Sequence, residues 1–122
     1  MTEGYAGLQH AVESAGFFTT FQPIQEPGDR IVCASHQYPD GHERYGLYGN
    51  SFWVARRGKD WYIASWAPHI YRVGSPERAG ELCLHLLKRK GGGAYWDFDE
   101  GVQRTFGLVE VSVEEFGRAA AR

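Results

Sequence analysis

The chain has 122 residues, of which 43% are hydrophobic and 15% aromatic, so we expect one domain with a core of its own. Its 15 acidic and 13 basic residues leave a net charge of -2. That balance argues against the basic surface typical of proteins that bind nucleic acid or anionic membranes.

A helix is the first predicted element. Tyr5, Leu8 and Val12 recur at helical spacing within residues 5–15. Gly16 follows where a left-handed residue commonly ends a helix. The pattern predicts an N-terminal helix with one apolar face.

Extended segments come next in the chain. Residues 17–24 are rich in aromatic and β-branched side chains, and residues 30–37 have β-branched residues at their centre, so both predict strands. Proline and glycine punctuate residues 39–50, and unstructured loops of this length are uncommon in compact domains. We therefore expect either a hairpin with a mobile tip or an ordered functional loop here.

The stretch SFWVARRGKDWYIASWA, residues 51–67, holds three of the four tryptophans. Gly58 followed by Lys59 predicts a type II′ hairpin turn, which would pair Arg57 with Asp60. Bulky side chains then lie on both sides of the hairpin. One side carries Phe52, Val54, Ile63 and the Arg56–Trp61 pair, and the other carries Trp53, Ala55, Tyr62, Ala64 and Trp66.

The second half of the chain predicts two more strands and two more helices. A strand at residues 69–73 precedes a helix at about residues 76–90, which has serine at its N-cap, proline in its first turn and three glycines after its end. Residues 108–113 suit a strand near the centre of the sheet. A capping box at residues 112–115 predicts a short C-terminal helix over residues 113–121.

This order predicts one α+β domain spanning residues 1–122. We expect a single-layer, mostly antiparallel sheet of about five or six strands, with the amphipathic helix of residues 76–90 on one face. An N-terminal helix and a short C-terminal helix complete the expected fold.

The two cysteines and the termini bear on the cellular compartment. Cys33 and Cys83 lie in apolar surroundings, far apart in the chain, and we predict two buried free thiols. The first residues lack a signal-peptide pattern, and no apolar run approaches the roughly 20 residues of a membrane span. A cytoplasmic location follows as the expectation.

Residues suited to catalysis gather only around one loop. His36 and His42 flank it, with Asp40 and Glu43 nearby, so a small metal-binding or ligand-binding enzyme is the alternative function. Ser35 precedes His36, but adjacent strand residues should point to opposite faces. Since the HExxH, CxxC and GxSxG motifs are absent, we predict no catalytic residue, no metal and no cofactor.

A binding face is the leading functional expectation. Tryptophan and tyrosine dominate binding hot spots because they bring large area with few rotatable bonds. If the helix of residues 76–90 covers the side that carries Phe52, the side that carries Trp53 is left for a partner, a ligand or the N-terminal helix. We therefore predict a non-catalytic module whose partner is another protein. The predicted binding residues are Trp53, Tyr62, Trp66, Tyr48, His69, Asp97 and Asp99.

Size, slight acidity and element order resemble those of small α+β proteins that bind another protein, such as the immunity proteins that block toxins. No motif carries this resemblance, so no residue role is transferred. Other expectations about partners are no nucleic acid, no membrane and a possible homodimer that buries its rings.

Overall fold

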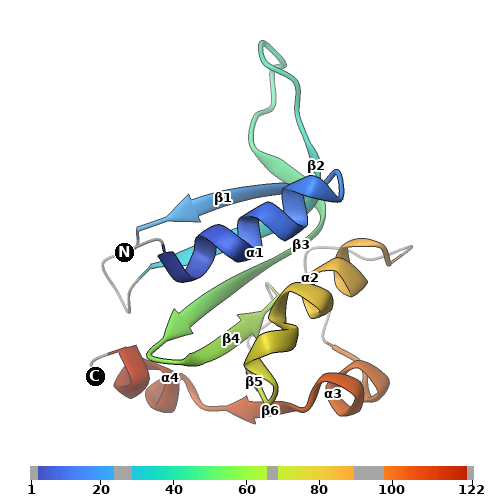
Figure 1. Cartoon of the computed structure of the whole chain (residues 1–122). Helices are drawn as coiled ribbons and strands as arrows, with labels where there is room; N and C mark the ends of the chain where they lie inside the picture. The colour runs from blue at the N-terminus through green and yellow to red at the C-terminus, as the bar shows by residue number, and fades with distance from the viewer. Residues whose placement is uncertain (1–2, 24–28, 66–68, 90–97, 121–122) are drawn as a thin grey trace.

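The computed structural model describes residues 3–23, 29–65, 69–89 and 98–120. These residues form one antiparallel sheet whose six strands lie in chain order, with four α-helices around it (Figure 1). The predicted α+β class, the N-terminal helix and the short C-terminal helix are confirmed. The elements are α1 (Glu3–Ser14), β1 (Phe18–Gln22), β2 (Arg30–Gln37), β3 (Leu47–Arg57), β4 (Asp60–Ala64), β5 (Ile70–Val73), the 3₁₀ turn η1 (Pro76–Arg78), α2 (Ala79–Leu87), α3 (Glu100–Phe106), β6 (Leu108–Val111) and α4 (Val113–Ala120).

The β3–β4 hairpin has the predicted register. Arg57 pairs with Asp60, and Val54 pairs with Ile63. Gly58 has a φ of 63°, whereas no described non-glycine residue has a positive φ, so the turn needs glycine only at its first position. That is the requirement of a type II′ turn, which suits the twist of the flanking strands.

Two elements near the C-terminus differ from the prediction. Helix α3 was not predicted, although Asp99 caps it by accepting a hydrogen bond from the Val102 N–H at 2.9 Å. Gly107 ends α3 in the left-handed region, with a φ of 64°. Strand β6 pairs only with β5, so it is an edge strand of the described sheet and not the central strand expected from its valines.

One face of the sheet packs against α1, α2 and α3. Phe52, Val54 and Ile63 point into this core and are at most 1% exposed. The helix predicted over residues 76–90 begins as η1 and continues as α2, and its buried stripe faces these strands. Figure 1 shows α1 and α2 lying across this face of the sheet.

The opposite face is covered by the C-terminal helix, which corrects the predicted binding face. Phe116 of α4 packs on Trp53 and Tyr62, with ring centroids 5.6 Å and 5.1 Å apart. Trp53 is therefore 9% exposed and Tyr62 4% exposed. The expectation that these rings are left for a partner is wrong, because the sequence pattern did not indicate that α4 packs there.

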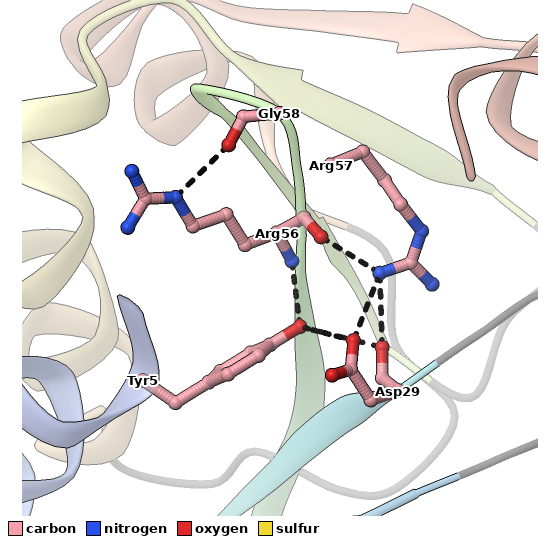
Figure 2. A network of polar contacts seen from close by, with 5 residues as sticks. All are labelled: Tyr5, Asp29, Arg56, Arg57 and Gly58. Atoms are coloured by element: carbon pink, nitrogen blue, oxygen red, sulfur yellow. Dashed lines mark hydrogen bonds and ion pairs between the residues drawn. The ribbon is translucent and has the colours of Figure 1, made fainter. Parts of the chain in front are cut away.

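A polar network joins α1 to the turn end of the β3–β4 hairpin (Figure 2). The Tyr5 hydroxyl donates to Asp29 Oδ1 at 3.1 Å and accepts from the Arg56 N–H at 2.8 Å. Arg57 donates through one guanidinium nitrogen to the Asp29 carbonyl, at 3.0 Å, and to the Arg56 carbonyl, at 2.8 Å. The same guanidinium lies over the Phe116 ring, 4.9 Å from its centroid, so the network links both layers to the sheet.

The network predicts a loss of stability at alkaline pH. Burial raises the pKa of the Tyr5 phenol above its ordinary value of 10.0; the Arg56 N–H opposes this shift and the Asp29 carboxylate adds to it. Because the folded state favours the neutral phenol, its contribution is complete below pH 10 and is lost as the pH rises further. We expect urea unfolding to show a falling free energy from pH 9 to 11, and a weaker fall in Tyr5→Phe. Equal slopes of unfolding free energy against pH for the wild type and Tyr5→Phe would contradict the role of the Tyr5 phenol.

Candidate functional site

The β2–β3 hairpin extends beyond the rest of the sheet. The β1–β2 register ends at the pair Phe18–Ala34, and the β3–β4 register begins at the pair Trp53–Ala64. Residues 35–50, here called the β2–β3 arm, therefore pair only with each other among the described strands. Figure 1 shows the arm projecting away from the helices and from the other strands.

A β-bulge lies at the base of the arm. The β2–β3 register pairs Ala34 with Ser51 but His36 with Tyr48, so the two residues Gly49 and Asn50 of β3 lie opposite the single residue Ser35 of β2. The extra residue is therefore on β3, and a glycine with a positive φ, such as Gly49, is typical of such a bulge. Next to the bulge, Ser35 Oγ lies 2.9 Å from His36 Nδ1, so the expectation that these two side chains point apart is wrong.

Glycine is required at position 49, within the bulge. Its φ is 88°, and a Cβ atom there would collide with Ser35 Oγ and lie 2.7 Å from His36 Nδ1. We therefore expect Gly49→Ala to lower the free energy of unfolding by about 2 kcal/mol, from positive-φ strain and the displaced Ser35–His36 contact. Urea unfolding measures the loss. Gly117→Ala is the control, because a Cβ atom at this position in α4 would have nothing within 4 Å. An equally large loss of unfolding free energy in the control would show that the bulge is not the reason for the loss in Gly49→Ala.

Asn50 ties the base of the arm to α2. Its backbone N–H donates to Ser35 Oγ at 3.0 Å. Its buried side-chain amide lies within hydrogen-bond reach of the carbonyls of Leu86, Leu87 and Arg89. The final carbonyls of a helix have no partner within the helix. One asparagine thus supplies donors to the end of α2 and holds the arm against the body.

Four rings of the arm form a stacked ladder. The ring centroids of His36 and Tyr48 are 5.0 Å apart, those of Tyr48 and Tyr38 are 4.2 Å apart, and those of Tyr38 and His42 are 5.0 Å apart. All three pairs are within 24° of parallel. Stacking of this kind holds each ring in one orientation.

The tip of the arm is an ordered turn. The His42 N–H donates to the Pro39 carbonyl at 3.1 Å, and Gly41 has a φ of 83°, as a type II turn requires at its third residue. The Arg44 N–H donates to His42 Nδ1 at 3.0 Å. The segment therefore forms part of a hairpin whose tip is a hydrogen-bonded turn.

Two tyrosines of the arm are exposed. Tyr45 is 91% exposed and Tyr48 is 39% exposed. Tyr38 and Tyr45 were not among the predicted binding residues. The sequence signal that points to them is the recurrence of rings at positions 36, 38, 42, 45 and 48, a pattern that is distinct from metal-binding and catalytic spacings.

Four other predicted binding residues lie outside the arm. His69 Nδ1 lies 2.7 Å from Glu110 Oε2, and Asp99 caps α3 and lies 3.6 Å from an Arg89 nitrogen. Trp53 and Tyr62 are buried under α4. Trp66 and Asp97 lie outside the described residues. Of the predicted set, only Tyr48 is placed in the ring ladder.

Groups able to bind metals or act as nucleophiles are few in the described part of the chain. No three His, Cys, Asp or Glu side chains there are grouped as a metal site would need. Cys33 and Cys83 are buried free thiols, as predicted. A hydrogen bond with Cys33, together with burial, raises the pKa of the Cys83 thiol, so it stays protonated and is a poor nucleophile.

Comparison with known proteins finds no matching family model, no matching curated protein and no matching solved structure. Within the described ranges, no helix has the length and apolar character needed to cross a membrane. The geometry of the arm is therefore the basis for a functional proposal.

Proposed function

We propose that the protein is a non-catalytic protein-binding module that contacts another protein through the β2–β3 arm. The observation that carries this proposal is the ring ladder of His36, Tyr48, Tyr38 and His42, beside the almost fully exposed Tyr45. Tyrosine is enriched at binding surfaces because it combines large contact area, a hydroxyl group and few rotatable bonds.

Preorganisation of the arm supports the same proposal. Binding costs free energy when side chains and loops must be ordered, and that cost falls when they are ordered beforehand. In the arm, stacking holds the rings, and the contacts of Ser35 and Asn50 hold the backbone at the base. A ribbon of two strands is marginally stable alone, so these contacts serve to keep it in one shape.

The experiment is affinity capture from an extract of the source cells, with the wild type and with Tyr45→Ala/Tyr48→Ala as bait. The recovered protein is then purified and titrated against each bait by calorimetry. We expect the arm variant to weaken binding by about 2 kcal/mol or more, roughly 30-fold in Kd.

The matched control is Val109→Ala/Val113→Ala, which trims two exposed apolar side chains away from the arm. Val109 is 49% exposed and Val113 is 65% exposed. We expect this control to bind as the wild type does. A partner that binds the arm variant with unchanged Kd would rule out the arm as the contact surface.

A small enzyme is the second candidate, favoured by the contact between Ser35 and His36. A hydroxyl within 2.9 Å of an imidazole nitrogen is the spacing of a nucleophile and its base. His36→Phe separates the candidates, because it keeps a ring on Tyr48 and removes the base. Turnover of p-nitrophenyl acetate that is abolished in His36→Phe and in Ser35→Ala would favour the enzyme; partner binding retained by His36→Phe would favour the module.

A further inference from the structure

We infer that the partner surface that receives the β2–β3 arm is concave and lined with arginine side chains. This inference depends on the proposed function, since it names the chemistry of the partner at the same site. It follows from how the chain packs its own rings, from the charges at the tip and from the shape of the arm.

The body of the protein repeatedly packs a guanidinium group on an aromatic ring. Arg78 lies over Phe106 at 4.6 Å, and Arg57 lies over Phe116 at 4.9 Å. Such pairs combine the attraction of a cation to a ring face with contact between two flat groups. No arginine of the described residues lies over a ring of the arm, so the exposed ring surfaces there are open to a guanidinium from outside.

The charge at the tip of the arm also favours a guanidinium group. Asp40 and Glu43 are exposed and close to Tyr45 in sequence, and neither forms an ion pair with another described residue. Arg44 supplies one positive charge against these two negative charges. A guanidinium can place its donors on a carboxylate and its flat face on a ring at the same time, whereas a lysine ammonium is a compact point charge.

The shape of the β2–β3 arm indicates that the partner surface that receives it is concave. The arm extends from the sheet as a narrow two-stranded ribbon with its turn at the far end (Figure 1). A flat partner would touch only the tip. A partner with a groove can contact Tyr45 at the tip and Tyr48 along the ribbon together.

The probe is a pair of synthetic peptides of equal length and charge, one alternating glycine with arginine and the other glycine with lysine. Each is titrated into the full chain labelled with nitrogen-15, and amide shifts are followed by NMR. We expect shifts centred on residues 38–48, with roughly 2- to 5-fold weaker binding of the lysine peptide. Tyr45→Ala/Tyr48→Ala should abolish the difference between the peptides.

Asp40→Asn/Glu43→Gln should weaken both peptides. The matched control is Glu114→Gln/Glu115→Gln, which removes the same charge from exposed residues of α4 and should leave both affinities unchanged. Equal affinity for the two peptides, or shifts centred on α4, would overturn the inference. If captured-partner binding still depends on Tyr45 in that case, the arm remains the docking site and only the arginine chemistry is wrong. If Tyr45→Ala/Tyr48→Ala leaves partner binding unchanged, the proposed function itself fails.

Discussion

Replacing Phe116 by alanine is expected to lower the free energy of unfolding by about 3–5 kcal/mol, the range for a large buried ring. Phe116 is 4% exposed and contacts Trp53, Tyr62 and the Arg57 guanidinium. Its removal leaves a cavity between α4 and the sheet, and α4 has little other apolar surface with which to stay in place. Urea unfolding gives the loss.

The control for this prediction is Val113→Ala in the same helix. Val113 is 65% exposed, so we expect its truncation to change stability by less than about 0.5 kcal/mol. A Phe116→Ala protein with near wild-type stability would mean that the packing of α4 on the second face of the sheet contributes little to the free energy of unfolding.

Replacing Arg57 by methionine is expected to cost about 3 kcal/mol, the lower end for breaking a buried ion pair. The Arg57 side chain is 6% exposed, and its removal leaves the Asp29 carboxylate without its cation. Asp29 keeps 28% of its side-chain exposure, so water compensates in part and the upper end of the range is not expected. Methionine retains packing on Phe116 while removing every guanidinium hydrogen bond.

A double-mutant cycle isolates the polar part of this effect. Asp29→Ala alone should also destabilise, and Arg57→Met/Asp29→Ala should cost less than the sum of the two single changes. Unfolding of all four proteins in urea supplies the coupling free energy. Strict additivity would show that Arg57 acts by packing alone.

The parts of the fold that could be predicted depend on residues that are close together in the sequence. Gly58 predicted both the β3–β4 turn and its register, and Gly16 predicted the end of α1, because each requires a positive φ that glycine adopts without strain. The Ser112 N-cap was confirmed in the same way, since Ser112 Oγ accepts the Glu115 N–H at 3.0 Å at the start of α4. Helix α3 carries equivalent local signals in Asp99 and Gly107, although it was not predicted.

The candidate site was predicted only in outline. The segment of residues 39–50 was marked as unusual, and Tyr48, His36 and His42 were named within or beside it. The bulge at Gly49 and Asn50 was not predicted, because a register shift is a property of two paired strands and not of either one. The contact between Ser35 and His36, which are adjacent on β2, likewise does not follow from strand alternation.

The sequence by itself determined that bulky rings lie on both sides of the β3–β4 hairpin, because turn chemistry and a two-residue repeat are local. Only the tertiary structure decided which rings are exposed. Trp53 lies near the middle of the chain and Phe116 near its end, and burial arises from such contacts between segments far apart in sequence. The same long-range packing that covers Trp53 stops short of the β2–β3 arm, and it leaves Tyr45 in solvent.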